Sequence, residues 1–465
     1  MKSRKSVLIV GHGAAGLSAA LSAAERAQQL ARPLQIAVVE QTSAAQAGGG
    51  TRFSPSNMRL GPAEQMRGEF ETLWEEDGRY DREYFGALAD LAEPTLEWLS
   101  SHGVRFEQIP YYLAATPRYR PVGGGAALIE QLTQSARNAG VEVTYDFEAE
   151  EIVREAEEII GIRGTGSNGA PAQLPCDSVV LACGGFQGNR NLLREHLGPG
   201  AEDLKPISPG SGHNRGAGLQ MALALGAAKT GDWGGMHCEP IDSRSDHPAP
   251  VVLTYPFGIV VDRLGRRFFD EGAGLVHETW EDFARAIHFR APGRIAYAVL
   301  DSRVYEIPDW RRAVRSDVAP VEAGTVTGLA EKLGIPGDAL QNTVGQFNAC
   351  APNDEKRFDP SRHDGLAAFG LNPPKSNWAR PINRPPYFAY PLICGIAYTF
   401  GGLSTDKRAC VLSKDGPVSR LYAAGEITGH FYRRAPNAIS VLRSIVFGRI
   451  AGHASVDDLC REAGT

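Results

Sequence analysis

The sequence predicts an α/β protein in which a domain built on a parallel sheet is interrupted by a separate α+β segment. Two short apolar runs, residues 7–10 (VLIV) and 179–182 (VVLA), each lead into glycines, as buried parallel strands often do before a helix. They lie about 170 residues apart, which indicates one sheet with long insertions and not a tandem repeat. From residue 232 to about residue 372 the sequence is richer in Trp, Pro, Asp and Arg, and it resumes the earlier character after residue 389.

The first 40 residues contain the most informative motif. A predicted strand, residues 6–10 (SVLIV), is followed by GHGAAG, an alanine-rich helix and a second strand that ends at Glu40. In such a unit Gly11 allows the tight turn, Gly13 lets the backbone approach a pyrophosphate, and Gly16 lets the helix pack closely on the strand. The helix N-terminus favours the diphosphate, and Glu40 is placed to accept hydrogen bonds from ribose hydroxyls. Although a glycine-rich turn alone is weak evidence, the two strands and the acid together predict a Rossmann-like dinucleotide site.

The bulk composition excludes several classes of protein. The length of 465 residues allows two or three domains, and 43% hydrophobic with 22% charged residues is typical of a soluble globular chain. A net charge of −6 gives no general attraction for nucleic acid or an anionic membrane. Seven scattered cysteines without a C-x-x-C pair argue against disulfides or a metal site and favour a reducing, cytoplasmic location. The apolar run near the start is too short for a signal peptide, and no window approaches the ~20 apolar residues of a spanning helix.

Residues 44–54 (AAQAGGGTRFS) form a loop with three consecutive glycines. This loop is either a surface linker or a backbone that passes close to a flat ring, where any Cβ would collide. We favour the second interpretation because the loop directly follows the acid that is expected to bind ribose.

Hydrophobic periodicity predicts the remaining elements of the first domain. They are helical sequence over 63–102, a glycine turn at 121–128 that opens a helix to about residue 139, a β-meander over 141–153 and 159–164, a strand over 178–187, and a glycine-led helix over 213–227.

The inserted segment, residues 232–372, is predicted to be an α+β cap. Its hairpin spans 257–271 and turns at Leu264-Gly265, and its helices lie near 329–333 and 338–347. The first domain, divided into residues 1–231 and 373–465, then resumes after a polar, Pro-rich return linker. Its last predicted elements are a strand over 420–426, a loop over 429–438 and a helix over 439–453.

Six motifs occur in order along the chain. They are G-x-G-x-x-G with Glu40, the glycine run ending in Thr51, LACGGF at 181–186, RGAGLQMA at 215–222, GIVVDRLGRRFFDE at 258–271 and LYAAGEITG at 421–429. Together these motifs resemble the FAD-dependent fumarate reductase/succinate dehydrogenase flavoprotein family, which includes 3-ketosteroid dehydrogenases. Within that family, residues 48–52 (GGGTR) and 425–452 are most similar to the tricarballylate dehydrogenase type.

The resemblance implies a three-layer ββα FAD-binding domain and a mobile cap that closes over the flavin. Covalent members attach the flavin through a histidine in the glycine-rich segment, and since residues 46–55 contain no histidine, we expect non-covalent FAD. The helix that begins at 437–440 (NAIS) would direct its N-terminal dipole at the flavin and stabilise the reduced ring, a role that an ordinary helix cap also permits. The residues that we expect to contact the cofactor are Gly11, Gly13, Ala14, Ala15, Gly16, Glu40, Gln41, Gly48, Gly49, Gly50, Thr51, Ala149, Ala182, Gly184, Gly218, Gly425, Glu426, Ser440 and Leu442.

Two residues match, or replace, the histidines with which the family binds substrate. His237, in GMHCEP, falls where the first histidine lies, although a lone histidine is also compatible with a structural role. The family stretch H-H-T-M-G-G corresponds to residues 397–402 (AYTFGG), so that Tyr398 replaces the second histidine. Tyr398 would donate a hydrogen bond to a carbonyl or carboxylate, or act as a general base if its pKa were lowered; a core tyrosine is the alternative.

The carboxylate-binding arginine of the family precedes the last helix. This chain has Arg433 and Arg434 there, in a segment one residue shorter, and we favour Arg434. The alternative is that both arginines are solvated. His430 is a further candidate that would face the flavin or the substrate.

The cap lacks a recognisable proton donor. Fumarate reductases use an arginine shortly after the R-F-x-x-E segment, and no arginine follows RFFDE at that spacing here; His277 and Arg285 are the nearest substitutes. This departure counts against fumarate reduction itself. Tyr255, together with later tyrosines, permits a ketosteroid-type reaction in which one tyrosine polarises a ketone and another abstracts a proton.

We therefore expect an FAD-dependent dehydrogenase that desaturates a Cα–Cβ bond next to a carboxylate, with a tricarballylate-like polycarboxylate as first candidate. One alternative is a ring-ketone desaturase of the ketosteroid type, and another is a non-catalytic flavin-binding subunit. Electrons would pass to a separate acceptor, such as a membrane-bound electron-transfer protein, because no NAD(P)H site or iron–sulfur cysteines are visible. The oligomeric state is left open.

Overall fold

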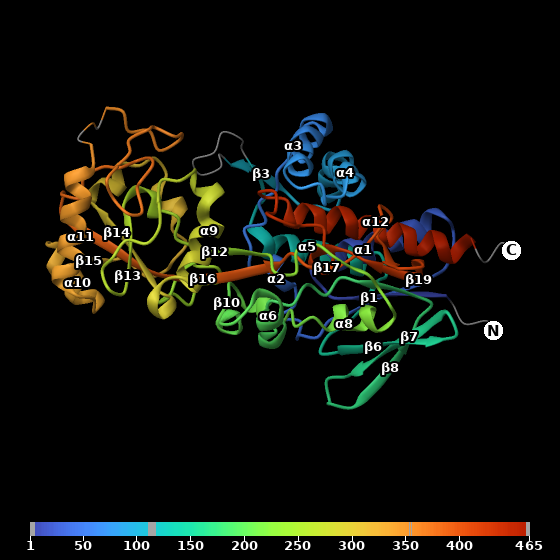
Figure 1. Ribbon diagram of the computed structural model, residues 1–465. Helices are drawn as coiled ribbons and strands as arrows, with labels where there is room; N and C mark the ends of the chain where they lie inside the picture. Colours follow the sequence, from blue (N-terminus) through green and yellow to red (C-terminus); the bar gives the residue numbers. More distant parts are fainter. Residues whose placement is uncertain (1–4, 110–117, 353, 355, 462–465) are drawn as a thin grey trace.

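The computed structural model describes residues 5–109, 118–352, 354 and 356–461, and Figure 1 shows them as two lobes. The larger lobe contains both ends of the described chain, and the smaller lobe is formed mainly by the yellow and orange part of the sequence. The expected domain ends at residues 1 and 465 lie outside the described residues.

A mostly parallel sheet forms the centre of the larger lobe. Among the described residues its strand order is β18-β19-β9-β1-β2-β5, and only β18 with β19 is antiparallel. Strand β1 lies between β2 and β9, so the two apolar runs of the sequence are neighbours in one interrupted sheet, as predicted. The strands are β1 (Ser6–Val10), β2 (Gln35–Val39), β5 (Glu142–Thr144), β9 (Ser178–Leu181), β18 (Cys410–Ser413) and β19 (Gly416–Ala423).

The two faces of this sheet pack against different layers. Alternate side chains of β1 point to opposite faces: Val7 and Ile9 join a core with helices α1 (Ala14–Gln29), α5 (Gly124–Asn138) and α12 (Ser440–Arg461). Leu8 and Val10 join a second core with the antiparallel sheet β6 (Glu148–Glu155), β7 (Glu158–Thr165) and β8 (Pro171–Pro175). This arrangement confirms the expected three-layer ββα domain.

Helices α1 and α12 cross in direct backbone contact. A Cβ on Gly448 would lie 2.4 Å from the Ala15 oxygen, and one on Gly452 would lie 2.2 Å from the Ala19 oxygen. Since only glycine permits this approach, the first turns of α1 are held against the middle of α12. The helical stretch expected over 63–102 is two helices, α3 (Ala63–Glu76) and α4 (Arg82–Ser101), which lie beside α12 in Figure 1.

The smaller lobe is an α+β cap around a second sheet. Its long strand β16 (Tyr387–Thr399) pairs with β14 and β15 through its first half and with β12 and β10 through its second half, so it runs from the cap into the larger lobe. The other strands of this sheet are β10 (Lys205–Pro206), β12 (Met236–Asp242), β13 (Ile259–Asp262), β14 (Ala296–Asp301) and β15 (Val321–Ala323). The cap helices are α9 (Val276–Phe289), α10 (Val326–Leu333) and α11 (Gly337–Cys350).

The apolar core of the cap continues beyond residue 372. Trp378, Phe388, Tyr390 and Leu392 pack in the same cluster as Phe283 of α9. We therefore propose that the cap extends to about residue 392, past the expected limits of 232–372.

The hairpin expected over 257–271 is only partly formed. Gly265 makes the turn with φ +73°, and a single bridge joins Val261 to Arg267. The chain then leaves the sheet, the Arg267 guanidinium pairs with Glu271 at 2.6 Å, and β13 pairs with β14.

Short elements connect the two lobes or extend their edges. They are α2 (Gly49–Arg52), β3 (Phe106–Ile109), β4 (Arg118–Pro121), α6 (Arg190–Leu197), α7 (Pro209–Gly212), α8 (Ala217–Ala224), β11 (Lys229–Thr230), β17 (Gly402–Leu403) and the 3-10 turns Ala201–Asp203, Tyr255–Phe257, Pro292–Arg294, Ser302–Glu306, Trp310–Ala313 and Gly425–Ile427.

All seven cysteines are free thiols. Among the described residues, no helix is long and apolar enough to cross a bilayer, and no three His, Cys, Asp or Glu side chains are grouped to hold a metal ion.

Candidate active site

The turn after β1 forms a cradle at the start of α1. Gly11 has φ +109°, and a Cβ there would lie 2.5 Å from the Ala182 oxygen; a Cβ on Gly16 would lie 1.8 Å from the Gly11 oxygen. Gly13 differs, because the nearest protein atom to its Cβ position is 3.8 Å away. It is also the N-cap of α1 and makes no side-chain capping bond, so the first N–H groups of the helix are available to an anion.

Glu40 is held rigidly at the end of β2. Its Oε2 accepts a hydrogen bond from the His12 N–H (2.9 Å), and its Oε1 accepts from the backbone and hydroxyl of Thr42 (2.9 and 2.8 Å). The carboxylate borders the cavity described below, and Oε2, which accepts only one of these bonds, retains a lone pair for a ligand hydroxyl.

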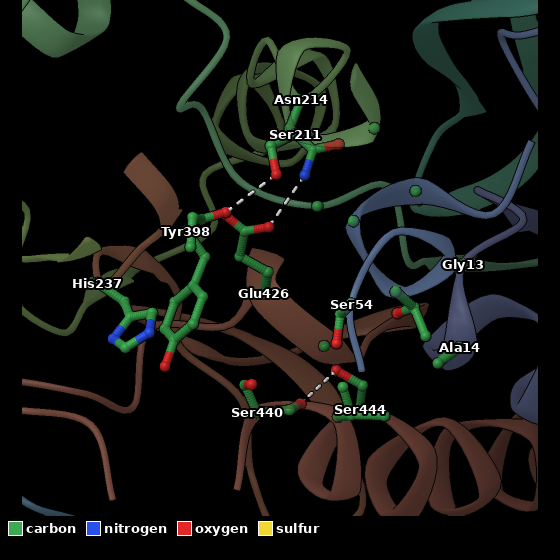
Figure 2. A pocket seen from close by; sticks show the side chains of 18 of the residues that line it. Gly13, Ala14, Ser54, Ser211, Asn214, His237, Tyr398, Glu426, Ser440 and Ser444 are labelled. Carbon is green, nitrogen blue, oxygen red and sulfur yellow. Dashed lines mark hydrogen bonds between the residues drawn. The ribbon is translucent and has the colours of Figure 1, made fainter. Parts of the chain in front are cut away.

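One cavity of about 850 Å³ extends from this cradle to the cap. Figure 2 shows Gly13 and Ala14 on one side of it, with His237 and Tyr398 on the other. The expected cofactor residues that line it are Gly11, Gly13, Ala14, Ala15, Glu40, Gln41, Gly49, Gly50, Thr51, Ala149, Ala182, Gly184, Gly218, Gly425, Glu426 and Ser440.

Three expected cofactor residues do not line the cavity. Gly16 and Gly48 shape the backbone next to it: Gly16 permits the packing of α1 on β1, and Gly48 has φ +123°. Leu442 is fully buried, and its side chain packs in the core beneath α12 instead of facing a ligand.

The residues present fit FAD. The cradle at Gly13 is a space that a larger side chain would fill, and Gly50 is similarly open, with only the Ser211 hydroxyl within 3.5 Å of its Cβ position. The uncapped start of α1 suits a diphosphate, and Glu40 suits a ribose. The cavity lies within the range of roughly 300–1,000 Å³ that is usual for ligand sites.

Glu426, in the turn after β19, is largely buried and lines the cavity. It accepts hydrogen bonds from the Thr399 N–H (3.1 Å), Asn214 Nδ2 (3.0 Å) and Gln187 Nε2 (3.2 Å); the bond from Asn214 is drawn in Figure 2. Burial raises the pKa of this carboxyl despite those bonds.

His237 and Tyr398 are paired across β12 and β16, and their rings stack with centroids 4.7 Å apart. Both nitrogens of His237 already have carboxylate partners, Nδ1 with Glu281 and Nε2 with Glu239 at 3.3 Å. Arg315 donates to the other oxygen of Glu239 at 3.0 Å. The imidazole therefore has no free nitrogen for a substrate, which corrects the expectation that it binds one directly.

We expect His237 to remain an imidazolium well above neutral pH. Burial lowers its pKa, but Glu281 and Glu239 outweigh burial and raise the pKa from 6.5 to about 10. Because the folded pKa exceeds the unfolded one, this pair stabilises the fold fully below about pH 6.5 and less as the pH rises toward 10. NMR of ring-labelled histidine should show one charged imidazole through pH 8, absent in His237→Gln; titration of that signal near pH 6.5 would contradict the assignment.

The surroundings of Tyr398 favour its neutral form, which donates a hydrogen bond. Burial raises the pKa of its hydroxyl, the Glu281 carboxylate adds to this effect, and the Arg443 guanidinium opposes it. These surroundings do not lower the pKa of Tyr398, so they do not support the expectation that it acts as a base.

The structure places the two candidate arginines at the edge of the site. Arg434 lines the cavity, but its Nη2 is paired with Glu76 at 2.5 Å and its side chain is half exposed. Arg433 is exposed and does not line the cavity.

His430 and Tyr255 lie away from the cavity. His430 stacks on Tyr84 with centroids 3.6 Å apart, its Nε2 is 2.8 Å from the Thr405 hydroxyl, and burial lowers its pKa to about 3. Tyr255 is fully buried in the cap, where its hydroxyl is 2.7 Å from that of Thr279. Both are packing residues, so their expected roles beside flavin or substrate are corrected.

Several residues of the site were not singled out from the sequence. Arg443 of α12 lines the cavity and is 1% exposed; its Nη1 donates to the Thr428 oxygen at 3.3 Å, and its guanidinium lies 4.0 Å from the Phe431 ring centroid. The cap adds Glu239, Glu281, Arg311 and Arg315 to the same cavity. The sequence offers one signal for Arg443, which is the arginine in the otherwise apolar start of the last helix, SVLRSIVF.

The family described as FAD binding domain matches residues 6–438. The chain is 28% identical over 397 residues to the NADH:acrylate oxidoreductase of Vibrio harveyi, covering 82% of this chain and 37% of that protein. It is 28% identical over 360 residues to the 4-oxocyclohexanecarboxylate 2-dehydrogenase of Sinomonas cyclohexanicum, covering 71% of this chain and 60% of that protein. It thus spans less than two thirds of either relative.

Solved structures share the fold. The open conformation of a flavocytochrome c3 fumarate reductase superimposes with a TM-score of 0.80 at 23% identity, covering 98% of this chain and 79% of that one. With the FAD-type cradle, the three-layer domain and a family match over nearly the whole length, the chain belongs to the FAD-dependent fumarate reductase/succinate dehydrogenase flavoprotein family.

Proposed function

We propose that this protein is an FAD-dependent oxidoreductase that transfers a hydride between the flavin and a carbon–carbon bond next to a carboxylate. A tricarballylate-like polycarboxylate is the first candidate substrate. The names of the two relatives, which concern an acrylate and an oxocyclohexanecarboxylate, are compatible with a carboxylate of this kind.

One observation carries the proposal: Arg443 is a buried cation on the wall of the cavity with no acid partner. Among the described residues no carboxylate forms an ion pair with it, and its Nε has no hydrogen-bond partner. A buried charge without a partner costs several kcal/mol. Its charge acts on Tyr398 and on the carboxyl of Glu426, and both of these residues line the same cavity. A substrate carboxylate would supply the missing negative charge.

FAD supplies hydride transfer when it is bound, and the chain holds and orients the reactants. The start of α1 would hold the diphosphate and Glu40 the ribose. The start of α12, which lines the cavity from Ser440, would favour negative charge on the ring. Arg443 would orient the carboxylate, and the hydroxyl of Tyr398 would donate a hydrogen bond to it.

We expect the flavin to be bound without a covalent link. No histidine lies in residues 46–55, the segment that carries the link in covalent members of the family. Acid precipitation of the purified protein should therefore release all of its yellow colour into the supernatant. Flavin that stays with the precipitate and appears on a tryptic peptide would contradict this expectation.

A second candidate is desaturation next to a ring ketone. It is favoured by the neutral hydroxyl of Tyr398, which can donate a hydrogen bond to a ketone oxygen. A Tyr398→Phe variant that loses activity, beside an Arg443→Gln variant that keeps it, would favour the ketone over the carboxylate.

We propose that electrons pass to, or come from, a separate redox protein. The relatives named for NADH oxidation are much longer than this chain, which leaves the acceptor to be identified by experiment.

The proposal is tested by mixing the FAD-loaded protein, without oxygen, with polycarboxylates, cyclic ketones and the amides that correspond to the acids. We expect bleaching of the flavin by at least one acid and by none of its amides. Bleaching by ketones alone would support the second candidate, and no bleaching by any compound would support a non-catalytic flavin-binding subunit.

A further inference from the structure

The proposed reaction requires a group that moves a proton at the carbon next to the one that exchanges the hydride. This inference rests on the proposed function and identifies that group. We propose that Glu281, on the cap helix α9, takes up the proton during desaturation and returns it during reduction.

Glu281 lies at the cap side of the cavity, where Tyr398 and Arg443 also lie. Its side chain is 20% exposed, and Oε1 is bound to His237 Nδ1. No hydrogen bond or ion pair joins Oε2 to any residue that the structure describes, and the side chain borders the cavity. One carboxylate oxygen is thus fixed in place, and the other is available to a ligand.

The carboxylate and imidazole next to Glu281 are already committed to partners. Glu239 uses one oxygen for His237 and the other for Arg315. Both nitrogens of His237 are engaged, so it acts as a positioning residue that fixes the orientation of Glu281. The Tyr398 hydroxyl keeps its proton because burial raises its pKa.

The two substitutes named from the sequence fit less well. Arg285 does not line the cavity, and its Nη2 donates to the Met236 oxygen at 3.0 Å. His277 does line the cavity, one turn before Glu281 on α9, but it is not part of the Glu281–His237 pair that stacks against Tyr398.

The proposed step balances as follows. In desaturation, one C–H bond would break and its hydrogen would leave with the electron pair as a hydride, which FAD would accept when bound. The adjacent C–H bond breaks, its proton goes to Glu281 Oε2, and its electron pair becomes the second bond of the alkene. Arg443 would stabilise the negative charge that develops on the substrate carboxylate as this proton leaves. In reduction, the proton and the hydride move in the opposite directions.

Because α9 belongs to the cap and His237 lies on β12, the bond between Glu281 and His237 joins the cap helix to the strand that leads into the larger lobe. The packing of the cap therefore places Glu281 at the part of the cavity where the flavin would bind. This arrangement explains how the cap can supply a proton acceptor without the arginine that fumarate reductases use.

The test compares Glu281→Gln with Asp282→Asn in the full-length, FAD-loaded protein. Asp282 is the next residue on α9, is exposed and does not line the cavity, which makes it a matched control for the loss of one carboxylate. The probes are tricarballylate and succinate for the reaction, and malonate as a non-reacting dicarboxylate whose binding is followed by the flavin spectrum.

We expect Glu281→Gln to bind FAD and malonate as the wild type does but to lose at least ~100-fold in the rate of flavin bleaching, as general acid–base groups contribute about 10²–10⁴-fold. It should also lose the exchange of substrate C–H with deuterium from the solvent. Glu281→Asp should recover part of the rate, and Asp282→Asn should match the wild type.

A Glu281→Gln enzyme that bleaches within about threefold of the wild-type rate would overturn the assignment of Glu281 and leave the proposed function intact. A defect that appears equally in malonate binding would assign Glu281 to cap packing instead of proton transfer. A wild-type protein that reacts with no acid would overturn the proposed function, and this inference with it.

Discussion

Replacing Arg443 with glutamine should weaken the binding of a polycarboxylate by roughly 100-fold or more while FAD stays bound. Removal of one partner from a buried charge pair costs about 2–5 kcal/mol, and every 1.4 kcal/mol is a tenfold change in affinity. Arg443 is 1% exposed and forms no ion pair with an acid among the described residues, although its charge also acts on the buried carboxyl of Glu426. The effect is measured by titrating malonate or tricarballylate against the flavin spectrum of the variant without oxygen.

Two neighbouring arginines serve as controls for this prediction. Arg433→Gln should leave binding unchanged, because that side chain is exposed and lies outside the cavity. Arg434→Gln should cost less than about tenfold, since exposed ion pairs such as that with Glu76 contribute only about 0–1 kcal/mol. The account of Arg443 would be contradicted if its glutamine variant bound the acids normally, or if the protein lost FAD first.

Valine at Gly13 should strongly weaken FAD binding without unfolding the protein, whereas valine at Gly16 should destabilise the fold itself. At Gly13 the nearest protein atom to a Cβ is 3.8 Å away, so the new side chain would occupy the cradle and displace the cofactor. At Gly16 a Cβ would lie 1.8 Å from the Gly11 oxygen, which forces α1 away from β1. Overpacking costs typically 1–3 kcal/mol, so we expect FAD affinity at Gly13→Val to fall by about 10- to 100-fold or more.

These two variants are compared by FAD content and by thermal unfolding of the flavin-free protein. Gly13→Val should keep the unfolding temperature of the wild-type apoprotein, and Gly16→Val should lower it. Equal loss of stability in both variants would show that Gly13 is also a packing position and would remove it from the cofactor site.

The nucleotide half of the site could be predicted because its signals are local. The turn at Gly11, the start of α1 and the acid at the end of β2 lie within 40 residues, and their roles follow from backbone geometry. The three-layer arrangement was implied by the resemblance to the flavoprotein family and is confirmed by the two cores on either face of the sheet. The domain boundary at residue 372 was harder to place, because the polar, Pro-rich segment after it still contributes Trp378 to the cap core.

The substrate half of the site could be predicted only in part, because the role of each side chain depends on partners that are far away in the sequence. The position of His237 was recognised, but its role changes once Glu239 and Glu281 occupy both of its nitrogens, and Glu281 lies 44 residues further along the chain. His430 and Tyr255 stood beside motif residues in the sequence, yet backbone direction turns both into the core. Arg443 was missed because an arginine on the last helix is normally solvated, and its burial becomes visible only when α12 is packed against Phe431 and Thr428.

The measurement that tests the central claim most directly is a single anaerobic turnover of the FAD-loaded protein with tricarballylate, followed by identification of the product. The account predicts one unsaturated acid formed for each flavin reduced, with Arg443→Gln far slower at the same acid concentration. Flavin that tricarballylate and other polycarboxylates leave oxidised, or that only a ketone without a carboxylate reduces, would contradict the claim that the Arg443 side of the cavity binds a carboxylate next to the reacting bond.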